Sequence, residues 1–367
     1  MKKVLFLVNH DIVIYNFRLE LVERLIEDGY QVYVSSPYGE RIEDLKKLGC
    51  VFIKTRIDRR SVNPLADLLL LRFYMKVLGS VKPDIVLTYT IKPNIYGGIA
   101  CEYTRTRYIA NITGLGTALE YNGFLQVLSV LLYRVAFVKV NKIFFQNDEN
   151  MRFFVKHSIA CGRHSLLPGS GVNLKRFLPL DYPSDNTIEF AFISRIMKEK
   201  GIEQFLDTAV IIRSKYPQTR FHVCGFCEDE YEPRLIALHN KGIIIYHGMI
   251  RDVRKILALV HCTIHPTYYP EGLSNVLLES CACARPIITT DWSGCREVVD
   301  DGKNGFLVRP KSSADLIAKV ESFILQPYNT RLMMGLHGRK KVEKAFDRQI
   351  IIKKYMDEII KYGNGIN

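Results

Sequence analysis

Residues 262–290, CTIHPTYYPEGLSNVLLESCACARPIITT, are the stretch of this 367-residue chain that decides its fold. The apolar run at residues 262–265 predicts a buried strand, and the proline and glycine after it predict a loop. From Ser274 the apolar residues follow helical spacing, and a second apolar run occupies residues 286–290. A strand, a helix and a strand in this order form the unit of a parallel sheet, because parallel neighbours need a long crossover connection.

The same alternation continues over the rest of the chain. Strands are predicted at residues 4–8, 31–35, 51–55, 84–89, 108–112, 142–146 and 165–168, and in a second series at 188–194, 220–224, 242–246, 262–265, 286–290 and 305–308. Short apolar runs separated by helical stretches are typical of parallel α/β sheets that are covered on both faces. The sequence therefore predicts an α/β fold with two doubly wound, Rossmann-like domains.

A segment rich in proline, glycine and serine separates the two series. The length of the chain also exceeds what one hydrophobic core usually fills. We therefore predict an N-terminal domain at residues 1–170, a linker at 171–187 and a C-terminal domain at 188–347. The last predicted helix, at about residues 348–361, can belong to either domain.

Composition indicates the class of protein and its compartment. Apolar residues make up 48% of the chain and charged residues 24%, which is typical of a soluble globular enzyme and excludes disordered and collagen-like classes. The nine cysteines lack the spacing of a disulfide framework, and this favours a reducing compartment. The apolar run at residues 4–8 is too short for a signal peptide. We expect a cytoplasmic protein.

The positive charge is concentrated in the first half of the chain. The net charge is +13, and residues 1–180 hold 25 Lys and Arg against 15 Asp and Glu. Such a surface attracts nucleic acid, an acidic lipid leaflet or phosphorylated substrates. Two apolar helices predicted at 64–81 and 124–140 are too short and too often interrupted by cations to span a membrane. Each is either buried against the sheet or rests on lipid with its cations directed to the headgroups.

The segment from Glu271 to Glu279 predicts a nucleotide site. The backbone N–H groups of residues 272–275 lie at the start of a predicted helix, and such an end binds phosphate. Glu279 lies about 7.5 Å further along the helix axis, where a carboxylate can accept hydrogen bonds from a ribose. In the alternative interpretation, Glu271 only complements the helix dipole and Glu279 is solvated.

Arg195 and Lys200 form a second element. Arg195 follows the first strand of the second series, at the edge where doubly wound sheets bind ligands. Lys200 precedes the next helix and can meet Arg195 at one anion, where two cations would stabilise a departing diphosphate. The alternative is a solvated basic loop. His261 and His265 flank a predicted strand, and we interpret them as core or surface histidines rather than as metal ligands.

Arg-x4-Lys-Gly followed by Glu-x7-Glu resembles the pattern of family 4 of the retaining glycosyltransferases, which have the GT-B fold. Residues 285–291, 294–299 and 304–308 are also similar to that family. In the first half, residues 14–18, 61–64, 88–97 and 112–116 resemble transferases of capsular and O-antigen polysaccharide assembly and the bacterial N-acetylgalactosaminyltransferases that act on undecaprenyl-diphosphate sugars.

The resemblance implies two domains that face each other across a cleft, and it implies roles for particular residues. The catalytic residues are Arg195, Lys200 and Glu271, of which the two cations hold the donor diphosphate and Glu271 contacts the donor sugar; Glu279 binds the ribose, and Gly272, Leu273, Ser274 and Asn275 complete the donor site. Acceptor-binding positions are Asn16, Arg18, Lys92, Thr113 and Gly114. This chain departs from the family at Gly294-Cys295 and at Asn9-His10-Asp11, which replaces a glycine-rich turn.

The family's mechanism is usually described as a same-face displacement in which the departing phosphate helps to accept the acceptor proton. No Asp-x-Asp occurs in the chain, so the ligands of a metal-bridged diphosphate are missing, and we expect neither a metal nor another cofactor.

The leading hypothesis is therefore a transferase that uses a nucleotide-diphosphate sugar, with UDP as the expected nucleotide, and a lipid-linked saccharide on undecaprenyl diphosphate. It would act in bacterial surface polysaccharide or glycan assembly, on the anionic inner face of the cytoplasmic membrane. A GT-B sugar-nucleotide epimerase is the alternative enzyme. A basic nucleic-acid-binding protein is a third class, but the cations are dispersed and no recognised module occurs, so we expect no nucleic-acid partner.

Overall fold

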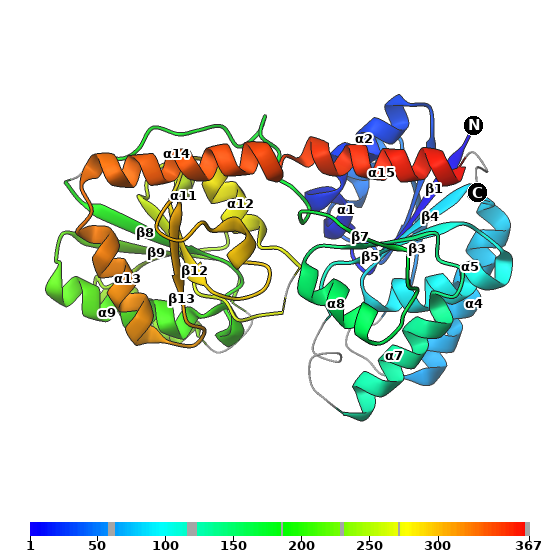
Figure 1. Ribbon diagram of the computed structural model, residues 1–367, viewed down its shortest axis with the longest axis horizontal. Coiled ribbons are helices and arrows are strands. Elements are labelled where there is room, and N and C mark those ends of the chain that lie inside the picture. Colours follow the sequence, from blue (N-terminus) through cyan, green and yellow to red (C-terminus); the bar gives the residue numbers. More distant parts are fainter. Residues whose placement is uncertain (58–62, 116–122, 185, 228–230, 271, 364–367) are drawn as a thin grey trace. The chain divides into compact units, whose positions relative to one another are not determined.

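The computed structural model describes residues 1–57, 63–115, 123–184, 186–227, 231–270 and 272–363. The chain divides into two compact units (Figure 1). The first holds Met1–Ser170, Pro270–Gly272 and Gln349–Asn367, and the second holds Gly171–Tyr269 and Leu273–Arg348. Each unit has its own parallel sheet, as the alternation of apolar runs predicts.

The first unit contains a seven-stranded sheet in the order β3-β2-β1-β4-β5-β6-β7. Its strands are β1 (Lys3–Leu7), β2 (Gln31–Ser36), β3 (Val51–Lys54), β4 (Ile85–Tyr89), β5 (Tyr108–Ile112), β6 (Lys142–Phe145) and β7 (His164–Leu166). Its helices are α1 (Asp11–Phe17), α2 (Leu19–Glu27), α3 (Ile42–Lys47), α4 (Pro64–Val81), the π-helix η1 (Pro93–Gly97), α5 (Gly98–Thr104), α7 (Phe124–Ala136), α8 (Asp148–Lys156) and α15 (Arg348–Gly363).

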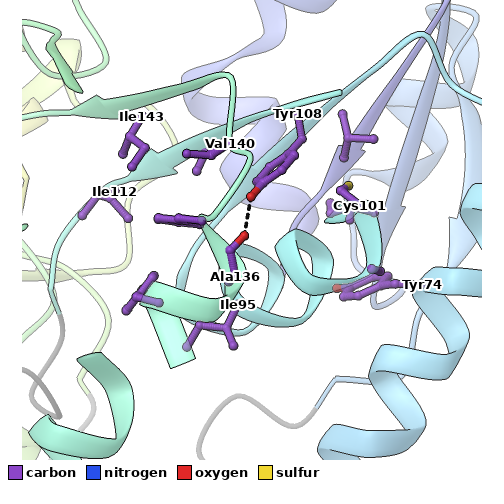
Figure 2. Close-up of a cluster of buried hydrophobic side chains, with 14 of the residues drawn as sticks. Tyr74, Ile95, Cys101, Tyr108, Ile112, Ala136, Val140 and Ile143 are labelled. Atoms are coloured by element: carbon purple, nitrogen blue, oxygen red, sulfur yellow. Dashed lines mark hydrogen bonds between the residues drawn. The ribbon is translucent and has the colours of Figure 1, made fainter. Parts of the chain in front are cut away.

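Helices cover both faces of this sheet, because its strands are apolar on both sides. In β1, Phe6 belongs to one buried cluster and Leu7 to the other, since successive side chains of a strand point to opposite faces. Figure 2 shows the cluster under α4, α5 and α7, where the Tyr108 hydroxyl donates a hydrogen bond to the Ala136 carbonyl. On the opposite face α15 packs beside α1–α3, and its Tyr355 ring lies 4.9 Å from the ring of Phe144.

The second unit contains a six-stranded sheet in the order β10-β9-β8-β11-β12-β13. Its strands are β8 (Ile188–Ile193), β9 (Thr219–Cys224), β10 (Ile245–Gly248), β11 (Cys262–His265), β12 (Ile287–Thr290) and β13 (Gly305–Val308). Its helices are the 3₁₀-helix η2 (Lys198–Lys200), α9 (Ile202–Lys215), α10 (Glu232–Asn240), α11 (Arg254–Leu257), α12 (Asn275–Ala282), the 3₁₀-helix η3 (Arg296–Val298), α13 (Ser313–Ile324) and α14 (Tyr328–Ala345). The stretch 262–290 is thus β11, α12 and β12, and its two strands pair in parallel.

The predicted strands are all present, and the clearest shift is at β10. The sequence predicts this strand at residues 242–246, whereas it spans Ile245–Gly248. The reason is that Gly242 adopts a φ of 69° and the N–H of Ile243 still donates to the carbonyl of Leu238, so these residues close α10 before the strand begins.

Within the ranges that the structure describes, no helix combines enough residues with enough apolar character to cross a bilayer.

Candidate active site

Two loops meet at the carboxyl edge of the second unit's sheet. They follow β8 and β11, which are neighbours in the sheet. The N–H of Tyr268 donates to the carbonyl of Glu199 over 2.8 Å, and the hydroxyl of Thr267 donates to the same oxygen over 3.3 Å. Open α/β sheets bind their ligands at this edge.

Arg195 and Lys200 converge on the ring of Tyr269 at this edge. The guanidinium carbon of Arg195 lies 5.2 Å from the ring centroid, and the ammonium nitrogen of Lys200 lies 4.9 Å from it. Both distances are within the ~6 Å over which an aromatic ring attracts a cation. Lys200 is buried, whereas Arg195 is exposed. The spacing Arg-x4-Lys therefore places two cations beside one aromatic ring.

Gly201 fixes the position of the loop that carries Lys200. Its φ of 79° lies in the left-handed region, and a Cβ at this position would lie 2.2 Å from the carbonyl oxygen of Pro266. Only glycine satisfies both conditions. The Lys-Gly pair in the motif thus has a structural cause, since Gly201 lets the loop after β8 lie directly against the loop after β11.

One backbone N–H group at the start of α12 already donates a hydrogen bond within the protein. Ser274 is the residue before the helix, and its N–H donates to the carbonyl of Gly294 over 2.8 Å. Leu273 and Ser274 are buried, and Asn275 is partly exposed. A phosphate contact to the Ser274 amide would therefore have to replace this internal hydrogen bond.

Glu279 lies on α12 and carries an unusual carboxyl group. Burial raises its pKa from 4.5 to about 7, although the nearby cations Arg348 and Arg176 lower it. The residue is only partly exposed, so the solvated alternative does not fit it. A carboxyl that titrates near neutral pH is typical of a functional position.

Glu271 lies outside the described residues, but its neighbour Gly272 is described. Gly272 groups with the first unit, where the Asn147 amide donates to its carbonyl over 2.8 Å. A Cβ at Gly272 would lie 2.2 Å from the side-chain oxygen of Gln146 and 2.7 Å from the carbonyl oxygen of Thr113. No side chain therefore fits at this position. Gly272, which is predicted to bind the donor, is thus a neighbour of Thr113, which is predicted to bind the acceptor.

The other predicted acceptor residues lie in different settings. Arg18 is buried with its guanidinium 5.4 Å from the ring of Tyr89 and 5.2 Å from that of Tyr355. Lys92 forms an ion pair of 2.8 Å with Asp67. Asn16 is exposed on α1, and Gly114 follows β5 one residue after Thr113. Arg18 and Lys92 are thus engaged with other side chains of the first unit.

The first unit contains a cavity that was not predicted from the sequence. It has a volume of about 260 Å³ and is lined by Asn9, His10, Asp11, Pro37, Tyr38 and Ile57, which follow β1, β2 and β3. Asp11 is buried, with one carboxylate oxygen 2.6 Å from a ring nitrogen of His10 and the other accepting the N–H of Arg41 over 2.7 Å. The sequence feature that could have indicated this cavity is Asn9-His10-Asp11, which directly follows the first strand. This tripeptide was interpreted only as a departure from the family.

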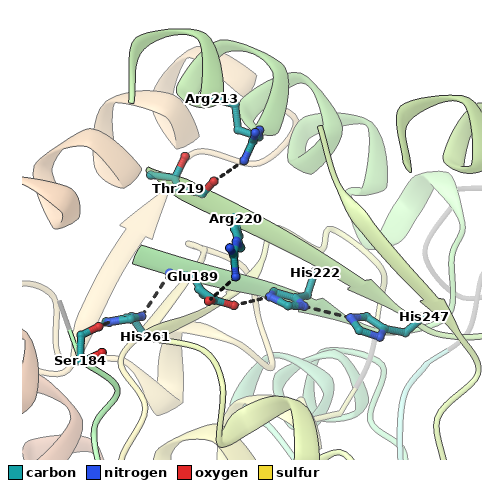
Figure 3. Close-up of polar contacts among 8 residues, drawn as sticks. All are labelled: Ser184, Glu189, Arg213, Thr219, Arg220, His222, His247 and His261. Carbon is teal, nitrogen blue, oxygen red and sulfur yellow. Dashed lines mark hydrogen bonds and ion pairs between the residues drawn. The ribbon is translucent and has the colours of Figure 1, made fainter. Parts of the chain in front are cut away.

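The histidines near β11 have structural contacts. In Figure 3, Nδ1 of His261 accepts the N–H of Glu189, so Nε2 carries the proton and donates to the carbonyl of Ser184. His265 is buried within the sheet. Among the residues that the structure describes, no three His, Cys, Asp or Glu side chains are placed to hold a metal ion.

Family models match both halves of the chain. Residues 3–147 match the model of glycosyl transferase 4-like domains, and residues 182–341 match that of glycosyl transferases group 1. The chain therefore belongs to the glycosyltransferases and combines a glycosyl transferase 4-like domain with a group 1 domain.

Relatives and solved structures agree with this. The chain is 25% identical to the N,N'-diacetylbacillosaminyl-diphospho-undecaprenol alpha-1,3-N-acetylgalactosaminyltransferase of Campylobacter jejuni, over 95% of this chain and 96% of that protein. It is 27% identical to the capsular polysaccharide biosynthesis glycosyltransferase CapM of Staphylococcus aureus, over 80% of each chain. Anabaena HepE in complex with UDP and glucose is similar with a TM-score of 0.80 and 16% identity, over 98% of this chain and 99% of that one. The predicted GT-B fold is confirmed.

Proposed function

We propose that this glycosyltransferase transfers a sugar from a UDP-sugar, with retention of configuration, to a saccharide carried on undecaprenyl diphosphate. The reaction would serve bacterial surface polysaccharide or glycan assembly. The observation that carries the proposal is the match to the Campylobacter jejuni transferase, whose name specifies an undecaprenol-linked acceptor and which aligns over 95% of this chain. The UDP bound in HepE supports the choice of nucleotide.

The donor site of this proposal comprises the edge that holds Arg195 and Lys200, together with Glu279 on α12, the helix that follows β11. Negative charge develops on the diphosphate as the glycosidic bond breaks, and fixed cations stabilise that charge most strongly where water is excluded. Lys200, which is buried beside Tyr269, suits this role. Glu279 would accept hydrogen bonds from the ribose, and Glu271 would contact the donor sugar.

The cavity beside β1 and β2 is our candidate for the acceptor saccharide. Its polar side chains, those of Asn9, His10 and Asp11, can exchange hydrogen bonds with sugar hydroxyls, and the ring of Tyr38 offers an apolar surface. It lies at the carboxyl ends of parallel strands, where α/β sheets bind ligands. The comparisons favour neither an epimerase nor a nucleic-acid-binding protein.

The proposal is tested by measuring nucleotide release from UDP-, GDP- and ADP-sugars, with and without an extract that contains lipid-linked saccharides. We expect release of UDP that depends on the extract, and a radiolabelled sugar that moves into the lipid fraction. Interconversion of the donor sugar without an acceptor would instead support an epimerase. Release that is confined to GDP or ADP would refute the assignment of the nucleotide.

We also propose that catalysis needs no metal ion, because the chain has no Asp-x-Asp that could bridge a diphosphate through a divalent cation. Turnover in EDTA is expected to stay within about twofold of that in the untreated enzyme, since Arg195 and Lys200 supply the positive charge. Loss of turnover in EDTA that Mn²⁺ or Mg²⁺ restores would contradict this.

A lipid-linked acceptor places the reaction at a membrane. We therefore propose that the protein works in the cytoplasm, bound peripherally to the inner face of the cytoplasmic membrane.

A further inference from the structure

The helix α7 is apolar on two opposite sides. Its Tyr133 and Ala136 are buried in the core of the first unit. On the other side, Val127, Leu131 and Val135 are 58%, 51% and 57% exposed. A surface helix of a globular protein normally has charged or polar residues on its outer side. The outer side of α7 therefore lacks the polar character that water favours.

The helix α4 repeats this pattern and adds cations. Leu65, Leu68 and Leu69 are 73%, 44% and 63% exposed. Steps of three and four residues from these positions lead to Arg72 and Lys76, which are also exposed, so all five side chains share one face of the helix. This face is apolar over its first turns and basic over the turns that follow.

The two helices belong to the same side of the first unit. Both pack against η1 and contribute to one buried cluster, and Figure 1 shows them on the same side of the sheet, opposite α15. Their outer faces are therefore available to one extended partner. Exposed apolar side chains that gather in this way on one side of a protein mark an interaction surface.

Charge indicates which partner fits. The only acidic residue in α4 and α7 is Asp67, and its carboxylate binds Lys92 and the Tyr96 hydroxyl. Arg72 and Lys76, together with Lys139 just after α7, are exposed cations. Apolar side chains flanked by cations suit an interface in which acyl chains lie beside anionic headgroups.

We propose that this docking face binds an anionic lipid leaflet, with its apolar side chains at the acyl boundary and its cations at the headgroups. The face consists of Leu65, Leu68, Leu69, Arg72, Lys76, Val127, Leu128, Leu131, Val135 and Lys139. The inference rests on the proposed function, because a lipid-linked acceptor requires an enzyme that reaches the bilayer surface.

The test is co-sedimentation of the full chain with phosphatidylcholine vesicles that contain or lack phosphatidylglycerol, across a salt series and without donor or acceptor. The apolar variant carries Leu68→Gln, Leu69→Gln, Leu131→Gln and Val135→Gln, and the charge variant carries Arg72→Gln, Lys76→Gln and Lys139→Gln. Arg134 is left unchanged because its guanidinium donates two hydrogen bonds to the carbonyl of His157.

Matched controls use the second unit. Val210→Gln with Ile211→Gln replaces apolar residues of α9 that are 41% and 48% exposed, and Lys340→Gln with Lys344→Gln removes exposed cations of α14. We expect the wild-type protein and both controls to bind the anionic vesicles. Binding by the charge variant should fall at least about tenfold at low salt and lose its salt dependence, because each cation near an anionic surface contributes to binding. Binding by the apolar variant should fall at least about tenfold at every salt concentration.

Three outcomes would overturn the docking face: no binding of the wild-type protein to either kind of vesicle, an equal loss in the controls, or a dimer in sedimentation velocity that only the apolar variant abolishes. The last outcome would assign the face to a second copy of this chain. Nucleotide release with acceptor in detergent micelles separates this inference from the proposed function. The apolar variant and the charge variant should both keep this nucleotide-release activity, because the acceptor is supplied without a bilayer. If the wild-type protein binds vesicles but transfers no sugar, only the proposed function is refuted.

Discussion

Replacing Lys200 with alanine is expected to lower kcat by about 10²- to 10³-fold, with a smaller rise in the KM for the donor. The ammonium group is buried beside Tyr269 and, in our proposal, faces the diphosphate whose charge grows as the glycosidic bond breaks. Such a charge contributes more to the transition state than to the bound donor. Arg195→Ala should lower kcat less, because Arg195 is exposed and water can replace part of its effect.

The control is Lys198→Ala, which removes an exposed cation of the same 3₁₀-helix and should leave both constants unchanged. Lys200→Met separates charge from packing, since it keeps a long apolar side chain in the buried site. If Lys200→Met and Arg195→Ala both turn over like the wild-type enzyme, the two cations do not act on the leaving group.

The fold could be predicted because its signals are local. The buried strands are short apolar runs such as residues 188–193, where Phe190 and Phe192 belong to one buried cluster and Ala191 and Ile193 to the other, and a parallel arrangement follows from the helices between the strands. The exact position at which a strand begins or ends is harder to predict, because it depends on residues outside the strand. The start of β10 depends on whether Gly242 closes the preceding helix, and the apolar residues around it fit either element.

The donor site could be predicted only in part. Arg195 and Lys200 are five residues apart, so their proximity follows from one loop. Tyr269 was not predicted, because its contact with them depends on β8 and β11 being neighbours in the sheet, and no local pattern shows that order.

Long-range packing also explains why the settings of the acceptor-binding residues were harder to predict. The setting of Arg18 depends on Tyr89 and Tyr355, which lie far away in the sequence. The two apolar helices α4 and α7 were open to two interpretations, burial against the sheet or contact with lipid. Each helix buries one face in the core, and the other face carries the exposed apolar residues.

Glu279→Gln is expected to raise the donor KM by about 10- to 100-fold at pH 8, because a hydrogen bond from the ribose to a carboxylate is stronger than one to an amide. In the wild-type enzyme the KM should fall as the pH rises from 5.5 to 8, since the carboxyl group ionises with a pKa of about 7. The variant should lack this dependence. Glu232→Gln, at an exposed position on α10, is the control and should follow the wild-type profile.

As the pH rises, the free energy of unfolding should fall, whereas donor binding should become tighter. Because burial raises the pKa of Glu279 from 4.5 to about 7, the folded protein holds this proton more tightly than the unfolded chain does between those pH values. The contribution of Glu279 to the free energy of unfolding is therefore fully present below pH 4.5 and is lost as the pH rises through 7. Glutamine cannot ionise, so urea unfolding should show Glu279→Gln gaining stability relative to the wild-type protein between pH 5 and pH 8. Parallel stability profiles together with an unchanged donor KM would show that the pKa of the Glu279 carboxyl is the same in the folded and unfolded protein and that Glu279 takes no part in donor binding.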